Sequence, residues 1–294
     1  MTKDRPYFYK IKEFVQNVVK KTEKNQVKVP LSSFGAINCR YRQRIAEVPF
    51  LYPSLVLVIS GQKSIYYGDK EIQCSSGDFF AIPALSKFDV VNTPDDSQQA
   101  YLALYLHFDM PLVERFRRLY QMDEARITNN LSIHFEGNEL LDSAVWHFLE
   151  ITKHPDRSDD ITEHRLMEIL LCLVKYCNAS HMLLSMSQKW SERVYSLLLA
   201  NPARIWLIKD VCTLLNVSES TLRRNLRNEN TSYRNVVEDV RMGLALAEVQ
   251  FTQLPISIIA ENCGYSSFSR FTSRFRQRFD TTPSQLRKEM AESG

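Results

Sequence analysis

The sequence lacks the features that mark a secreted, membrane-spanning or metal-binding protein. Its six cysteines include no Cys-x-x-Cys pair, and neither they nor the six histidines have a spacing typical of zinc. The longest apolar runs, such as Ser54 to Ser60, are far shorter than the roughly 20 residues that a membrane helix needs. The N-terminal MTKDRPYFYK contains no apolar core of a secretory signal. We therefore expect a cytoplasmic protein with reduced thiols, no metal and no cofactor.

A large excess of one charge is also missing, since the net charge is +3 over 294 residues. The distribution is nevertheless uneven. Residues 189–294 carry 15 Lys and Arg against 11 Asp and Glu, whereas the remainder carries 22 against 23. Between Gly264 and Lys288 there are six basic residues and one acid, Asp280. Positive charge is thus concentrated near the C-terminus, where it would suit a nucleic-acid surface.

The first part of the chain has the pattern of a small β-domain preceded by a helix. With 44% hydrophobic and 24% charged residues, the chain is typical of a globular protein long enough for two domains. Residues 7–21 have apolar side chains at helical spacing. From about Val27 to Phe108 short β-rich runs alternate with turn residues such as Gly61 and Gly68. This pattern predicts an antiparallel barrel or sandwich.

Helical periodicity returns after Met110, with apolar stripes over 139–151 and 161–178 and a polar loop at 154–160. The second stripe follows a near-heptad pattern. Such a helix could cover the β-domain or pair with a second subunit, and the sequence leaves both alternatives open. The candidate dimerisation residues are Leu166, Ile169, Leu170 and Leu173.

The last domain is predicted to be all helical and contains an internal repeat. Short helices around Val211 and Ile259 are each followed by a turn and a second helix, as in a helix-turn-helix unit. In the first unit Ser218 is a candidate N-cap, and Leu222 and Leu226 face inward. A long helix over 233–251 joins the two units.

The second helix of each unit has a polar and cationic outer face. In the stretch GYSSFSRFTSRFRQRF, residues 264–279, four phenylalanines form one stripe, and no acid is present locally to pair with the arginines. Such helices lie in the major groove, where arginine suits bidentate contact with guanine or phosphate. Two helices on one DNA face would enter grooves roughly 34 Å apart. The candidate DNA-contacting residues are Ser220, Arg223, Arg224, Arg227, Ser269, Arg270, Ser273 and Arg274.

These motifs resemble the AraC/XylS family of bacterial transcription regulators. The resemblance covers roughly residues 190–290, through DVCTLLNVSESTLRRNL, RMGLALAEVQF and IAENCGYSSFSRFTSRFRQRFDTTPSQLR. It implies a transcription regulator, preferentially an activator that contacts RNA polymerase. The family's DNA-contacting positions carry over to Ser220, Arg223, Arg224, Ser269, Arg270, Thr272 and Ser273.

The N-terminal half is similar to the cupin-like regulatory domains of that family, through PSLVLVISGQKSIYYGDKEIQCSSGDFFAIP. The resemblance implies effector binding or dimerisation. The histidine pair and glutamate of metal-binding cupins are absent, and Ile72 and Cys74 stand near the Gly68 turn. A small-molecule effector and a protein partner both remain open. An enclosed pocket containing Arg or Lys would favour an anionic effector, whereas a filled barrel with an exposed apolar patch would favour a protein.

The alternatives in which the protein is an enzyme lack the necessary residues. The segment 61–64, Gly-Gln-Lys-Ser, superficially resembles a phosphate loop, but no Gly precedes its Lys directly and position 56 is Val. The aspartate pairs at 95–96 and 159–160 are read as solvated turn acids. A DNA-repair methyltransferase would need a reactive cysteine and a four-cysteine zinc site, which Cys39 and Cys74 cannot build. We predict no enzymatic activity.

The sequence therefore predicts an α+β protein. A cupin-like β-barrel with flanking helices over 1–178 is expected to serve regulation or dimerisation. A linker over 179–188 and an all-α double helix-turn-helix DNA-binding domain over 189–294 follow. The expected partners are double-stranded promoter DNA, RNA polymerase and an effector or regulatory protein. A homodimer is an open alternative, and no membrane association is expected.

Overall fold

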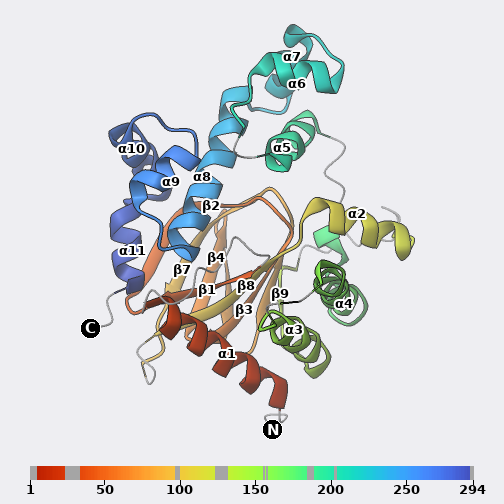
Figure 1. The fold of residues 1–294 in the computed structure, drawn as a ribbon, viewed down its shortest axis with the longest axis vertical. Helices are drawn as coiled ribbons and strands as arrows, with labels where there is room; N and C mark the ends of the chain where they lie inside the picture. Colours follow the sequence, from red (N-terminus) through yellow and green to blue (C-terminus); the bar gives the residue numbers. More distant parts are fainter. Residues whose placement is uncertain are drawn as a thin grey trace.

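The chain divides into a β-rich half and a helical half (Figure 1). The structure, a computed structural model, describes residues 5–23, 34–96, 100–122, 132–154, 156, 158–183, 189–201 and 204–291. None of the helices in these ranges is long and apolar enough to cross a membrane.

The β-rich half contains two antiparallel sheets. One has the order β1-β8-β3-β6-β9 and the other β2-β7-β4-β5, so the expected barrel is not closed but consists of two facing sheets. The strands are β1 Phe34–Cys39, β2 Gln43–Phe50, β3 Ser54–Ser60, β4 Gln62–Tyr67, β5 Lys70–Ser75, β6 Phe79–Ile82, β7 Ser86–Thr93, β8 Tyr101–His107 and β9 His134–Phe135.

Strand β3 separates two hydrophobic cores, which explains why all of its residues are buried. Successive side chains of a strand point to opposite faces. Leu55 and Leu57 pack against the N-terminal helices, whereas Val56 and Val58 pack between the sheets. The continuous apolar run in the sequence is therefore a strand covered on both faces.

Four helices cover the outer face of the five-stranded sheet (Figure 1). The stripe on the fourth helix lies in this core: Leu166 is 6% exposed, and Ile169, Leu170 and Leu173 are 0% exposed. These four side chains cover the β-domain within one chain, so they offer no free face to a second copy. The helices are α1 Pro6–Glu23, α2 Met110–Leu119, α3 Glu139–Ile151 and α4 Asp159–Tyr176.

The predicted linker belongs in part to the N-terminal core. Ala179, Met182 and Leu183 are almost fully buried there, and Ser180–Leu183 form a 3-10 helix. The rest of the linker, residues 184–188, lies outside the described residues.

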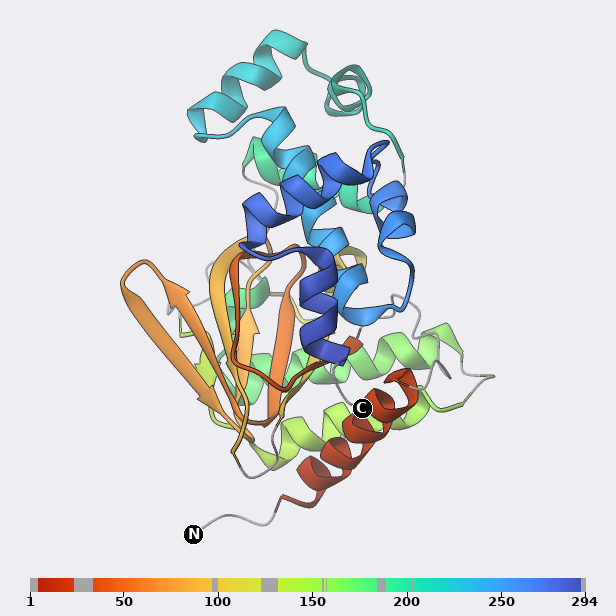
Figure 2. The ribbon, with the colours of Figure 1, turned by 90° about the vertical axis from the view of Figure 1, so that its left-hand side faces the viewer.

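Seven helices of the described residues form the C-terminal half. The long helix α8 joins the two helix-turn-helix units, and its C-terminal end packs against β1 and β2 (Figures 1 and 2). Helix α11 lies beside the sheets and packs against α8 and β1. The helices are α5 Trp190–Ala200, α6 Ile208–Leu215, α7 Glu219–Asn228, α8 Tyr233–Phe251, α9 Ile256–Asn262, α10 Phe268–Phe279 and α11 Pro283–Ala291.

Candidate nucleic-acid interface and effector cavity

The first helix-turn-helix unit consists of α6 and α7. Asn216 ends α6 in the left-handed region, at φ 54°, which asparagine tolerates better than most residues. The predicted cap is present, since the Ser218 hydroxyl accepts a hydrogen bond from the Thr221 amide at 3.1 Å. Leu222 and Leu226 are 0% exposed, so this side of α7 packs into the unit.

The second unit, α9 and α10, repeats this arrangement. Gly264 takes the left-handed position at φ 78°, and Ser267 caps α10 by accepting from the Arg270 amide at 3.3 Å. Phe271, Phe275 and Phe279 are fully buried, as the stripe predicts. Phe268 was expected in the same stripe, but it is 51% exposed. The helix begins at Phe268, so this first turn extends past the core that covers the rest of the stripe.

Most of the predicted DNA-contacting side chains lie on the surface of α7 and α10. Only Thr272 and Arg274 are partly buried. The two outer faces thus present hydroxyls and guanidinium groups, which can donate hydrogen bonds to phosphates and base edges. The exposed members of the set are Ser220, Arg223, Arg224, Arg227, Ser269, Arg270 and Ser273.

Two of the predicted DNA-contacting arginines have acidic partners, one on the same helix and one on another helix. Arg223 pairs with Glu219 at 2.6 Å, and Arg274 lies 3.9 Å from Glu238 of α8. Residues 264–279 contain no local acid, as the sequence shows, and the partner of Arg274 comes instead from another helix. Within the described part of the chain, Arg224, Arg227 and Arg270 make no ion pair.

An ion-pair cluster fastens the DNA-binding half to the four-stranded sheet. Asp239 of α8 accepts from Lys87 of β7 at 2.7 Å and from the Tyr195 hydroxyl at 2.5 Å. Its other carboxylate oxygen lies 3.0 Å from Arg278 of α10, which also pairs with Glu47 of β2 at 2.6 Å. Helix α10 is therefore tied to both α8 and the N-terminal half.

Two glycines allow α8 to lie close to the sheets. A Cβ atom at Gly35 of β1 would overlap the Phe251 ring, and one at Gly243 of α8 would lie 2.8 Å from a methyl of Leu51. The freed space lets Phe251 stack on Tyr105 of β8, with ring centroids 5.5 Å apart. Glycine in the middle of α8 costs helix propensity, which this close approach explains.

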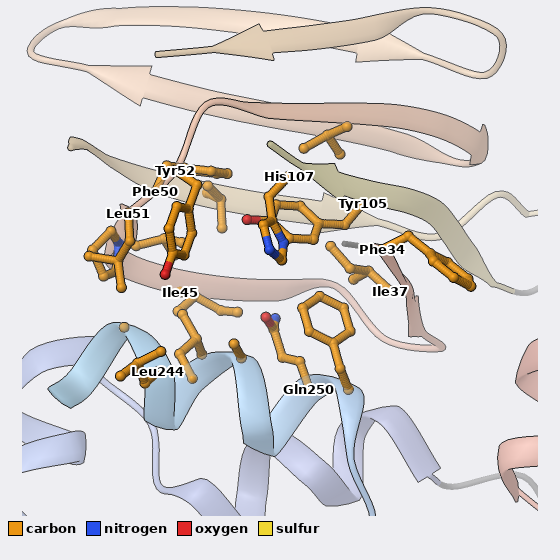
Figure 3. A pocket seen from close by; sticks show the side chains of 18 of the residues that line it. Phe34, Ile37, Ile45, Phe50, Leu51, Tyr52, Tyr105, His107, Leu244 and Gln250 are labelled. Carbon is orange, nitrogen blue, oxygen red and sulfur yellow. The ribbon is translucent and has the colours of Figure 1, made fainter. Parts of the chain in front are cut away.

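A cavity of about 110 Å³ lies between the sheets and α8 (Figure 3). Tyr105 and His107 line it from β8, and Gln250 points toward it from α8. Most of the lining is apolar. Burial lowers the pKa of His107 to about 4, so this imidazole is neutral at pH 7.

Lys63 is the one lining residue that carries a charge at pH 7 among the described residues around the cavity. It is 3% exposed and donates to the Asn92 amide oxygen at 2.7 Å. Its ammonium also lies 5.7 Å from the ring centroid of Tyr101, whose buried hydroxyl has no hydrogen-bond partner in the described residues. Burial lowers the pKa of Lys63 to about 8, because desolvation penalises the charged form.

In the sequence, Lys63 stands in the segment 61–64, which only superficially resembles a phosphate loop. The strand pattern nevertheless contains a signal for its burial. In the run QKSIYY, Lys63 is two residues from Ile65 and therefore shares its face of the strand, and Ile65 is fully buried. A lysine on the same strand face as a core isoleucine indicates a buried charge.

The described residues contain no group of three His, Cys, Asp or Glu side chains that could hold a metal ion. Cys39 and Cys74 are buried, and burial raises the pKa of Cys39 to about 12. A thiol with so high a pKa is not a nucleophile at pH 7.

Comparisons with known proteins match both halves of the chain. Residues 211–289 match a helix-turn-helix domain, and residues 53–184 match the ExsA N-terminal regulatory domain. The urease operon transcriptional activator of Escherichia coli is 34% identical over 103 residues, which are 35% of this chain and 35% of that protein. The transcriptional regulator YdeO of E. coli K12 is 31% identical over 137 residues, 45% of this chain and 54% of YdeO. The matches thus span about a third to about half of these relatives.

Solved structures of ToxT from Vibrio cholerae share the overall fold. Apo ToxT superposes with a TM-score of 0.67 at 12% identity, covering 90% of this chain and all of ToxT. ToxT with bound unsaturated fatty acid gives a TM-score of 0.65 at 16% identity, covering 91% and 99%. At these identities the likeness shows the fold alone.

Proposed function

We propose that this chain, a member of the AraC/XylS family, is a sequence-specific DNA-binding regulator of transcription, with activation as its main effect. It acts in the cytoplasm on double-stranded promoter DNA and contacts RNA polymerase. Its chemistry is binding and not catalysis.

One observation carries this proposal: α7 and α10 present equivalent outer faces. Each helix is capped by a serine, each is preceded by a left-handed residue, and each buries its opposite side. Phosphate contacts by the arginines would position the protein, and base contacts would give it a preferred sequence.

Footprinting of the full chain on genomic promoter fragments at physiological salt tests the proposal. We expect discrete protected sites that span two successive major grooves, because the chain carries two recognition helices. Equal binding to every fragment would contradict it. Such a result would mean that the arginines form only a general cationic surface.

We further propose that the cavity at Lys63 binds a small-molecule effector with an anionic group and an apolar body. A buried ammonium within an apolar lining suits a carboxylate, and this is the feature that favours an effector over a protein partner. ToxT, which shares the fold, binds an unsaturated fatty acid, a ligand that likewise combines an anionic group with an apolar body.

The volume limits the ligand that fits without movement. A cavity of about 110 Å³ is smaller than the roughly 300–1,000 Å³ of ordinary ligand pockets and close to the roughly 150 Å³ that holds a benzene. Only a short apolar body fits the cavity as it stands.

Calorimetric titration of the full chain with octanoate tests the effector site. Octan-1-ol serves as the uncharged control. We expect octanoate to bind at least about tenfold more tightly than octan-1-ol, and Lys63→Met to remove that difference. Lys70→Met, at an exposed position of β5, is the matched control. An unchanged preference in Lys63→Met would contradict the assignment.

A further inference from the structure

A row of buried polar side chains runs from the cavity to the last helix of the DNA-binding half. Lys63 of β4 lies opposite Asn92 of β7, and Asn92 lies opposite Gln43 of β2. Lys63 donates to Asn92 at 2.7 Å, Asn92 donates to Gln43 at 3.2 Å, and Gln43 donates to Glu289 of α11 at 3.2 Å. The three sheet residues are 1–3% exposed. Four side chains from different parts of the sequence thus form one continuous chain of hydrogen bonds.

The two ends of the row fix the direction of every hydrogen bond in it. A lysine ammonium can only donate, so the amide oxygen of Asn92 must face it. The amide nitrogen of Asn92 then faces the oxygen of Gln43, and the nitrogen of Gln43 faces the carboxylate of Glu289. A carboxylate only accepts, so neither amide can flip without breaking two bonds. Aligned dipoles of this kind polarise one another in a low-dielectric interior.

The row gives the buried Lys63 a distant counter-charge. Ion pairs and hydrogen bonds are what make a buried charge tolerable, and no acidic residue lines the cavity among the described residues. Glu289 therefore compensates the ammonium through two amides. An anion that enters the cavity would compensate it directly and would also repel the carboxylate of Glu289.

Helix α11 is placed to transmit a change at Glu289. Leu286 of α11 is fully buried in the core shared by the sheets and the second unit. Arg287 donates to the carbonyl oxygens of Leu254 and Thr252, in the turn that leads into α9. Weaker docking of α11 would consequently loosen the helix-turn-helix unit that contains α10.

We infer that the row from Lys63 through Asn92 and Gln43 to Glu289 couples the cavity to the DNA-binding half, so that an anion at Lys63 weakens the docking of α11. Glu289 and the anion compete for one buried cation. Coupling between two sites is reciprocal, so Glu289 in turn weakens anion binding. The inference rests on the proposed effector site. Two experiments test the coupling and the effector site separately.

The first arm needs no ligand. Hydrogen exchange of the α11 amides is measured in the full chain and in the variants Lys63→Met, Glu289→Gln and the double variant. We expect each single change to lower α11 protection about fivefold and the double change to lower it no further, because either one breaks the same row. The control cycle pairs Lys70→Met with Glu289→Gln and should be additive. Additive effects of Lys63→Met and Glu289→Gln would overturn the inference.

The second arm uses octanoate as the probe. Saturating octanoate should lower α11 protection in the unaltered chain and leave it unchanged in Gln43→Met, which interrupts the row but keeps Lys63. Glu289→Gln should bind octanoate several-fold more tightly. Octanoate binding with no response of α11 would overturn the coupling and leave the effector site intact. If octanoate does not bind, the effector proposal fails. The cycle of Lys63→Met and Glu289→Gln then decides by itself whether the row couples Lys63 to Glu289.

Discussion

Arg278 at the end of recognition helix α10 lies 2.6 Å from Glu47 in the N-terminal half. Glu47 sits where the pairing of β2 with β7 shifts register, and it has a φ of 46°. The irregularity projects its carboxylate toward α10. Helix α10, which is proposed to enter the major groove, is thus held at one end by the N-terminal half.

Glu47→Gln should strengthen DNA binding by the full chain, because it frees Arg278 from one of its two acidic partners. The carboxylate of Glu47 is 59% exposed, so the gain should be about 0–1 kcal/mol, or up to about fivefold in affinity. Electrophoretic mobility shift at low and at physiological salt measures it. Glu71→Gln, at an exposed position of β5, is the control. Weaker DNA binding by Glu47→Gln would show that the contact supports the binding conformation.

Arg223→Ala and Arg274→Ala should each weaken specific DNA binding by about 1–3 kcal/mol if these side chains read bases. Each of these arginines lies next to an acidic side chain in the free protein. A contact with DNA would therefore replace part of that ion pair. The affinities of both variants for the footprinted site and for sites with single base-pair changes show whether these arginines read bases. A loss that is the same on every sequence would reassign them to phosphate contacts.

Octanoate affinity should fall as the pH rises through about 8, because the pKa of Lys63 is lowered to about 8 and the anion needs the ammonium form. Above that pH the Kd should rise about tenfold per pH unit. The groups facing Lys63 are the thiols of Cys39 and Cys74, the phenol of Tyr101 and the amide of Asn92. Burial raises the pKa of both thiols and of the phenol, so they stay neutral over this range.

Calorimetry between about pH 6.5 and 9.5 checks this dependence. Burial holds the pKa of His107 near 4, so this residue does not titrate in the same window. A flat profile would mean that Lys63 does not hold the anion.

Gly243→Ala should separate α8 from the sheets, because the new methyl would lie 2.8 Å from Leu51. Overpacking of this kind costs about 1–3 kcal/mol, partly offset by roughly 1 kcal/mol of improved helix propensity. Thermal and denaturant unfolding measure the net loss. Adding Leu51→Val should recover part of it by making room. Full stability of the single variant would show that the loop carrying Leu51 moves aside at no cost.

Local patterns were sufficient to predict most individual elements. The apolar spacing placed a helix over 139–151, where α3 lies, and the serine caps and leucines placed α7. Helical periodicity was expected after Met110, but no separate helix was predicted over 110–119, where α2 lies. Phe268 was misplaced because periodicity gives the phase of a helix but not where its core contacts begin.

The predicted DNA-contacting set, apart from Thr272, was derived from helical periodicity, because a helix fixes which residues share a face. Thr272 entered it only through the family resemblance. The partners of that set do not follow from the sequence. Glu238 and Asp239 reach α10 from α8, and Glu47 reaches it from β2. These contacts depend on how helices and sheets pack, which no local spacing records.

By itself the sequence determined the two helix-turn-helix units, their outward arginines and the β-rich half before them, since helical and strand periodicities are local properties of the backbone. Only the tertiary structure decided that the stripe on α4 covers a sheet and that Lys63 lines a cavity against α8. It also decided that β2, β7 and β4 are neighbours, an order that brings Gln43, Asn92 and Lys63 into one row. Strand order and helix docking result from burial of apolar surface across the whole chain, and residues far apart in sequence meet only through them.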